Sequence, residues 1–109
     1  MSAKLSVLAS GSSGNSTYLA ADGFGLLIDI GLEPRALGSR LFTIGANWQR
    51  INAVLLTHTH TDHWKDATLE QLRRLRIPLY CHPQQNLVLS RYGQGHFEEL
   101  LREKLVIPY

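Results

Sequence analysis

Short apolar runs and longer amphipathic segments alternate along the 109 residues of this chain. Apolar runs of roughly four to eight residues between turn signals are typical of buried strands, whereas apolar positions spaced by three and four are typical of helices. The pair Asp22-Gly23 between two such runs predicts a hairpin. Glu33-Pro34 predicts the start of a helix, because proline fits the first helical turn. The predicted strands are residues 4–9, 17–21, 25–30, 53–56 and 79–81, and the predicted helices are residues 33–44, 68–75, 84–92 and 97–105.

The order of these elements indicates an α/β fold, since strands alternate with helices along most of the chain. The near-continuous apolar character of the strands favours a sheet that helices cover on at least one face. Thr68 and Gln71 fit a capping box, which predicts that the second helix begins at Thr68. Residues 106–109 have the character of the approach to a further strand.

The composition is that of an ordinary globular domain, with 44% apolar and 18% charged residues. A formal net charge of +2 is too small to indicate nucleic-acid binding by bulk electrostatics. We interpret the basic cluster Arg73, Arg74 and Arg76 as the solvated face of a helix. A single cysteine, Cys81, excludes an intramolecular disulfide and fits a reducing compartment. Its apolar surroundings predict a buried thiol. Because no apolar run is long enough for a signal peptide or a membrane span, we expect a cytoplasmic protein with no membrane partner.

Three of the five histidines gather in one short segment directly after a predicted strand. The segment reads His-Thr-His-Thr-Asp-His at residues 58–63, and neutral imidazole and carboxylate are ligands of zinc, iron and manganese. Continuing the strand's period of two sends His58 and His60 to one face. A turn beyond the strand can then bring Asp62 and His63 back beside them. These two ligand pairs predict the beginning of two metal sites, and the alternative is a histidine-rich polar surface loop.

The His-x-His-x-Asp-His segment resembles the signature of the metallo-β-lactamase superfamily, which lies in a turn at the end of a strand. The serine- and glycine-rich residues 10–16 and the hairpin that ends at residues 26–31 look like the opening of its YycJ-like branch. That branch is similar to ribonuclease Z and to the PhnP-type phosphodiesterases. The resemblance implies an αβ/βα four-layer sandwich with a mixed sheet and flanking helices. We expect residues 1–109 to be the amino-terminal portion of one such domain, truncated before its second half.

The resemblance also implies a hydrolase with two divalent metal ions. His58 and His60 would hold the first ion, and Asp62 and His63 the second, with zinc as the expected metal and manganese or iron as alternatives. A hydroxide that bridges the metals would attack the substrate, and Asp62 could accept the proton of the attacking water. The expected substrate is a phosphodiester or a nucleic acid. An ester or thioester hydrolase of the same fold and a non-catalytic metal-binding half-domain stay open as alternatives.

The superfamily completes its metal sites with a later His, a bridging Asp and a last His, each in the second half of the fold. We therefore expect this chain to need a carboxy-terminal half or an oligomeric partner for activity. His82 and His96 are weaker candidates for a further ligand, because His82 suits an N-cap-like position and His96 a helix start. Trp64 follows the motif where many superfamily hydrolases continue with glycine, and it is either a pocket wall or a core aromatic.

Two other places would support the site. Asp29 matches the superfamily's early aspartate, and we expect it to accept a hydrogen bond from a ligand histidine or a backbone amide rather than to bind metal. The alternative is a strand-end acid that caps the turn at Gly31. Asn15 and Ser16 are the candidates for substrate contact in the loop at residues 10–16, whose alternative role is a tight connection between strands. This loop lacks the Gly-Lys-Ser/Thr end of a P-loop, which excludes that type of nucleotide hydrolysis.

Overall fold

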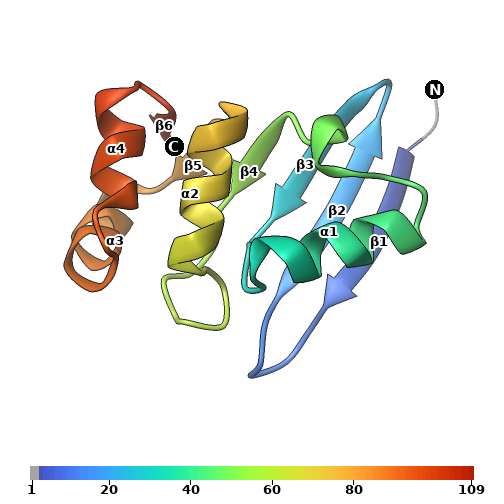
Figure 1. The fold of residues 1–109 in the computed structure, drawn as a ribbon, viewed down its shortest axis with the longest axis horizontal. Coiled ribbons are helices and arrows are strands. Elements are labelled where there is room, and N and C mark those ends of the chain that lie inside the picture. The colour runs from blue at the N-terminus through green and yellow to red at the C-terminus, as the bar shows by residue number, and fades with distance from the viewer. Residues whose placement is uncertain (1–2) are drawn as a thin grey trace.

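A mixed six-stranded sheet forms the centre of the structure, a computed structural model that describes residues 3–109 (Figure 1). The strands lie across the sheet in chain order; β1 to β3 are antiparallel and β3 to β6 are parallel. The strands are β1 (Ala3–Ala9), β2 (Ser16–Ala21), β3 (Phe24–Ile28), β4 (Ala53–Leu55), β5 (Leu79–Cys81) and β6 (Val106–Pro108). The helices are α1 (Pro34–Thr43), α2 (Asp66–Leu75), α3 (Asn86–Tyr92) and α4 (His96–Arg102), with the 3₁₀ turns η1 (Trp48–Arg50) and η2 (Pro83–Gln85).

The predicted hairpin joins β2 to β3 through a tight turn. Asp22 has a φ of 52° and Gly23 a φ of 81°. Positive φ at both central residues is the geometry of a type I′ turn, whose twist matches that of the flanking strands. Aspartate and glycine are among the residues that tolerate this left-handed region best. The hairpin prediction is therefore confirmed.

The helices cover one face of the sheet, which confirms the prediction of a mixed sheet with flanking helices (Figure 1). Each crossover from β3 to β6 moves one strand in the same direction, and a right-handed crossover then places every helix on the same side. Leu27, Val54 and Leu79 are fully buried beneath the helices. On the opposite face, Leu5 and Val7 are 66% and 64% exposed. The sheet thus has one buried apolar face and one open apolar face.

Two helix boundaries differ from the prediction. The second helix begins at Asp66, and Thr68 lies inside its first turn, where its hydroxyl donates to the carbonyl oxygen of Leu32 at 2.7 Å. The capping-box prediction is therefore wrong, because the Thr68 hydroxyl donates to Leu32, which is distant in sequence, and not to the start of its own helix. The last helix ends at Arg102, and Leu105 returns to the core just before β6. Among residues 3–109, no helix combines the length and apolar character that crossing a membrane requires.

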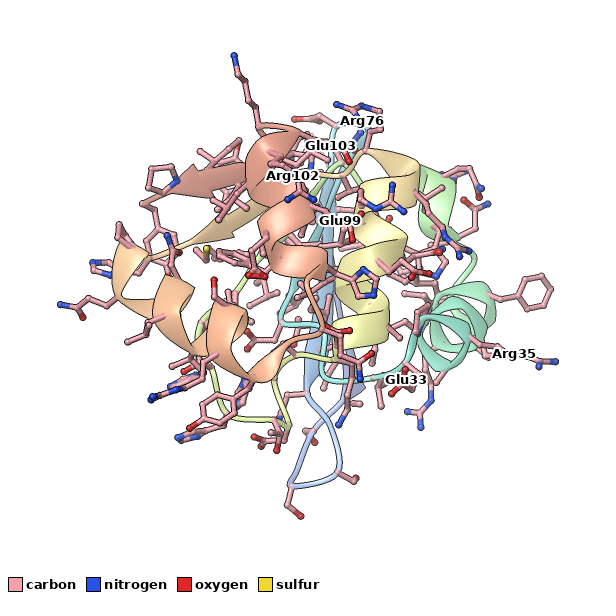
Figure 2. The ribbon with its side chains drawn as sticks, turned by 60° about the vertical axis from the view of Figure 1, so that its left-hand side comes forward. Glu33, Arg35, Arg76, Glu99, Arg102 and Glu103 are labelled. Atoms are coloured by element: carbon pink, nitrogen blue, oxygen red, sulfur yellow. The ribbon has the colours of Figure 1, made fainter. Side chains whose placement is uncertain are left out.

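The arginine cluster of α2 is paired with carboxylates of α2 and α4. The Nε of Arg73 lies 3.1 Å from a carboxylate oxygen of Glu99, and a guanidinium nitrogen of Arg76 lies 2.7 Å from Glu103. Figure 2 shows Arg76, Glu99 and Glu103 gathered where the two helices run side by side. Arg74 pairs with Glu70 one turn earlier in α2. The interpretation as a solvated face is confirmed for Arg74 and Arg76 and is wrong for Arg73, which is mostly buried against α4; the three arginines do not form an unpaired basic patch.

Cys81 generates a first prediction. The residue is 1% exposed, as expected of a buried thiol, and burial raises the pKa of the Cys81 thiol from 9.0 to about 11. Since the folded chain holds this proton more tightly than the unfolded chain, the stability it contributes is complete below pH 9.0 and is lost as the pH rises through about 11. Urea titrations at increasing pH should show the free energy of unfolding falling across this window. A Cys81→Ala variant should fall less steeply, and equal slopes for the two proteins would contradict the assignment.

Candidate metal centre

The motif loop, residues 56–65, connects β4 to α2 at the carboxyl ends of the parallel strands (Figure 1). At its entry, the backbone amide of Leu56 donates to the carbonyl oxygen of Tyr80 at 2.9 Å. At its exit, the amide of Ile30 donates to the carbonyl oxygen of His63 at 2.9 Å. Both ends of the loop are therefore held by hydrogen bonds that continue the pairing of the sheet beyond its strands.

The three histidine rings of the loop converge. The ring centroids of His58 and His63 are 4.7 Å apart, and those of His58 and His60 are 6.1 Å apart with the planes inclined by only 22°. The Oδ2 atom of Asp62 lies 3.7 Å from Nε2 of His63. The structure thus brings together all four residues that the sequence predicts as metal ligands, and their role as ligands stays a prediction.

Asp29 follows β3 and contacts this group from the interior of the fold, with 6% of its surface exposed. Its Oδ1 accepts a hydrogen bond from the backbone amide of Thr57 at 2.7 Å, and its Oδ2 lies 2.8 Å from Nδ1 of His63. An ionised carboxylate can only accept hydrogen bonds, so Nδ1 of His63 carries a hydrogen, and in the neutral ring Nε2 keeps a lone pair. This is the kind of contact that the sequence analysis expects of Asp29, and it leaves Nε2 available to a metal.

Thr57 extends this support to His58, and the sequence analysis missed it. The Thr57 hydroxyl donates to Oδ2 of Asp29, while its oxygen lies 2.9 Å from Nδ1 of His58. Because the single hydroxyl hydrogen is given to Asp29, Nδ1 of His58 must donate to Thr57. Nε2 of His58 therefore also keeps its lone pair. The only signal in the sequence is that a hydroxyl residue precedes the first histidine.

Asn15 orients the acidic member of the group. Its Nδ2 atom donates to Oδ2 of Asp62 at 3.0 Å and to the carbonyl oxygen of Asp62 at 3.2 Å. The close approach of the two loops requires glycine at position 31, because a Cβ atom on Gly31 would overlap the carbonyl oxygen of Asp62. The amide of Asn15 is thus engaged in positioning Asp62.

Ser16 requires a correction. Its residue surface is 1% exposed, and its hydroxyl donates to the carbonyl oxygen of Asp29 at 2.8 Å. A side chain without accessible surface cannot meet a substrate, so the expected substrate contact by Ser16 is wrong. The hydroxyl instead holds the backbone of Asp29, which adopts a left-handed φ of 66°. Ser16 thus supports the site from within the fold, while substrate contact by Asn15 stays a prediction.

The donor set fits a divalent transition metal. Two ligands that each lie about 2.0–2.2 Å from one ion are at most about 4.4 Å apart. The 3.7 Å between Nε2 of His63 and Oδ2 of Asp62 is within this limit. Donor atoms of Asp29, His58 and His63 lie within 4.8 Å of one another, a limit slightly wider than the span of one ion. Since both oxygens of Asp29 already accept hydrogen bonds, we assign it to the supporting position and leave the histidines and Asp62 as the donors.

The remaining candidates have structural positions. His82 caps η2, where its Nδ1 accepts a hydrogen bond from the backbone amide of Gln84 at 3.1 Å. His96 is the first residue of α4, beside carboxylates of α2 and α4. Trp64 is 5% exposed, and its Nε1 donates to the carbonyl oxygen of Thr59 at 2.9 Å. The tryptophan is therefore a core aromatic that braces the motif loop, and its edge also lines a cavity beside that loop.

Residues 9–99 match the metallo-beta-lactamase superfamily, and the chain belongs to it. Exodeoxyribonuclease WalJ of Streptococcus pneumoniae is 47% identical over 60 residues, which make up 55% of this chain and 22% of WalJ. Exodeoxyribonuclease YycJ of Bacillus anthracis is 35% identical over 82 residues, which make up 75% of this chain and 31% of YycJ. The hydrolase superfamily and the YycJ-like branch inferred from the sequence are thereby confirmed.

Solved structures support the same fold. A diphosphatase of the PhnP family has a TM-score of 0.64 at 23% identity, over 98% of this chain and 49% of that chain. The Rm3 metallo-beta-lactamase has a TM-score of 0.62 at 22% identity, over 79% of this chain and 32% of that chain. At such identities the likeness shows the fold alone. The chain spans 22% and 31% of the length of the curated relatives WalJ and YycJ.

The support from Asp29 generates a second prediction. An Asp29→Asn variant keeps a side chain that tolerates the left-handed backbone but loses one acceptor for His63 and Thr57. Removing the partner that orients a ligand histidine typically costs about 10–100-fold in metal affinity. Competition of the protein with a chromophoric chelator for zinc should show a loss of this size.

Asp22→Asn is the matched control, because Asp22 has the same residue type and a positive φ in the distant hairpin turn. It should bind zinc like the parent protein. Thermal melts of both variants separate lost affinity from lost folding. A folded Asp29→Asn variant with the parent's zinc affinity would show that Asp29 does not orient the ligands.

Proposed function

We propose that this chain supplies the amino-terminal part of a metal-dependent phosphodiesterase that acts on nucleic acid. The observation that carries the proposal is the convergence of His58, His60, Asp62 and His63 above the buried carboxylate of Asp29. The relatives named exodeoxyribonuclease favour phosphoester substrates over esters and thioesters.

We propose that the group begins a centre for two divalent ions. His58 and His60 would hold one ion, and Asp62 and His63 the other, with zinc as the proposed metal and manganese or iron as alternatives. When bound, such ions supply Lewis-acid activation of water and neutralise charge on phosphate oxygens. Imidazole donors and a carboxylate suit these borderline cations better than they suit calcium or magnesium.

Asp62 is the residue that we propose to accept a proton from the attacking water. Its side chain is 26% exposed, so solvent reaches it, and Asn15 Nδ2 donates one hydrogen bond to its carboxylate and one to its backbone carbonyl oxygen. A general base must be held within hydrogen-bonding reach of the proton that it removes. Asn15 would therefore act on catalysis through Asp62 as a positioning residue.

Replacing both histidines of the first pair tests the proposal. In a protein that contains this chain and its second half, His58→Ala with His60→Ala should reduce hydrolysis of single-stranded DNA by at least about a thousandfold, because metal ions supply several kcal/mol of transition-state stabilisation. His82→Asn is the matched histidine control, since asparagine can still cap η2. The rates are measured with added zinc and with added manganese.

Retained activity in the double variant would contradict the proposal. A parent protein that cleaves chromogenic esters or thioesters but no phosphodiester would replace it with the ester-hydrolase alternative. A parent protein that binds metal and cleaves none of these substrates would favour a non-catalytic metal-binding role. A circular dichroism spectrum of each variant shows whether its fold is intact.

We further propose that the open face of the sheet is covered by a second sheet in the active protein. Leu5 and Val7 are exposed on this face. Across the sheet, Val7 of β1 pairs with Thr17 of β2, Thr17 pairs with Ile28 of β3, and Ile28 pairs with Leu55 of β4. A broad exposed apolar patch marks a surface for another protein layer. The layer would come from a carboxy-terminal half or from an oligomeric partner.

For the whole protein, we propose a cytoplasmic location, which the unpaired Cys81 favours.

The open face generates a further prediction. A Leu5→Lys, Val7→Lys variant should reduce both self-association in sedimentation velocity and the fluorescence of bound anilinonaphthalene sulfonate. Its melting temperature should stay close to the parent's, because both side chains are largely exposed in the fold. Phe42→Lys is the control, since Phe42 is 79% exposed on α1, on the helical side. Equal effects of the two variants would show that the sheet face is not the associating surface.

A further inference from the structure

The four predicted metal ligands, His58, His60, Asp62 and His63, are called the metal group below. A cavity of about 420 Å³ adjoins this group on the side of α3. Thr59, His60 and Thr61 of the motif loop form one wall, Trp64 lies beside them, and Val88 and Tyr92 of α3 form the other wall. Its volume is within the range of about 300–1,000 Å³ that is typical of small-molecule sites. Because His60 lines the cavity and also belongs to the metal group, no other residue separates the two.

The lining indicates what the cavity accepts. Of the described residues that line it, none is Lys, Arg, Asp or Glu, and most of the lining surface is apolar. A phosphate would find no cationic partner there, whereas a flat aromatic ring would find apolar and aromatic walls. Tyr92 is 68% exposed, so a large part of its ring surface is available for contact. The hydroxyls of Thr59 and Thr61 can supply hydrogen bonds at the edge of such a ring.

Hydrogen bonds brace the backbone on both sides of the cavity. The indole of Trp64 donates to the carbonyl oxygen of Thr59, which anchors the floor of the motif loop. On the other side, the amide of Gln94 donates to Oδ1 of Asp66 at 2.9 Å, which ties the end of α3 to the start of α2. This contact needs glycine at position 93, because a Cβ atom there would overlap the carbonyl oxygen of Leu89. The backbone next to Tyr92 is thus tied to α2, and the exposed Tyr92 ring borders the same cavity as His60.

We propose that this cavity binds the nucleobase next to the phosphate held at the metal group, and that Tyr92 is its stacking residue. The inference rests on the proposed nucleic-acid substrate. Stacking of a base on an aromatic side chain tolerates every base, because each base has a π face. The site would therefore favour nucleic acid over simple phosphodiesters without selecting a sequence.

The test compares two probes that differ by one base. A zinc-loaded protein that contains this chain and its second half is titrated by calorimetry with thymidine 5′-monophosphate and with 2-deoxyribose 5-phosphate. Tyr92→Ala should weaken binding of the nucleotide about tenfold, as expected for the loss of one base–aromatic stack. The affinity for the sugar phosphate should stay unchanged. Tyr92→Phe should restore nucleotide binding to within about twofold. The Nε1–H resonance of Trp64 should shift with the nucleotide and not with the sugar phosphate.

Leu87→Ala is the matched control, since Leu87 is 71% exposed on the same helix and does not line the cavity. It should bind both probes like the parent protein. Unchanged nucleotide binding in Tyr92→Ala, or an equal loss for both probes, would overturn the base site while leaving the proposed function intact. Failure of both probes to bind the parent protein would overturn the proposed function and the base site together.

Discussion

The carboxylate of Asp29 is the interaction on which the rest of the site depends. It is buried, and it receives hydrogen bonds from the backbone of Thr57, from the hydroxyl of Thr57 and from the ring of His63. A buried carboxylate is costly unless its oxygens are hydrogen-bonded, and here the donors come from the motif that it supports. The same contacts therefore stabilise the fold locally and orient two ligand histidines, one directly and one through a threonine.

The backbone around Asp29 makes this arrangement rigid. The amide of Asp29 donates to Leu55, the amide of Ile30 to His63, and the amide of Gly31 to Asn15. Three consecutive amides thus join β3 to three separate segments: the end of β4, the motif loop and the loop before β2. Because these segments share one anchor, the four predicted ligands and their supports are held as a unit. The open sheet face lies outside this unit, and the cavity proposed to bind a base adjoins the unit at His60.

The features that were predictable from the sequence are those with a local pattern. Alternation of apolar runs, the Asp22-Gly23 turn and the spacing of the motif histidines each depend on neighbouring residues, and the structure contains the corresponding strands, hairpin and histidine cluster. The features missed by the sequence analysis depend on distant partners. Thr57 binds Asp29 across 28 positions, and Asn15 binds Asp62 across 47. Thr68 has the sequence pattern of a helix cap, but its hydroxyl instead donates a hydrogen bond to the carbonyl oxygen of Leu32.

The protonation of the histidine rings tests the central claim most directly. Long-range ¹H–¹⁵N correlation spectra of the metal-free protein distinguish the two neutral forms of each ring at alkaline pH, where imidazole is uncharged. The hydrogen bonds to Asp29 and Thr57 predict a hydrogen on Nδ1 of His63 and of His58. His82 is an internal reference for the opposite form, because its Nδ1 accepts a hydrogen bond and the hydrogen must lie on Nε2. A hydrogen on Nε2 of His63 would show that Asp29 does not orient the metal group.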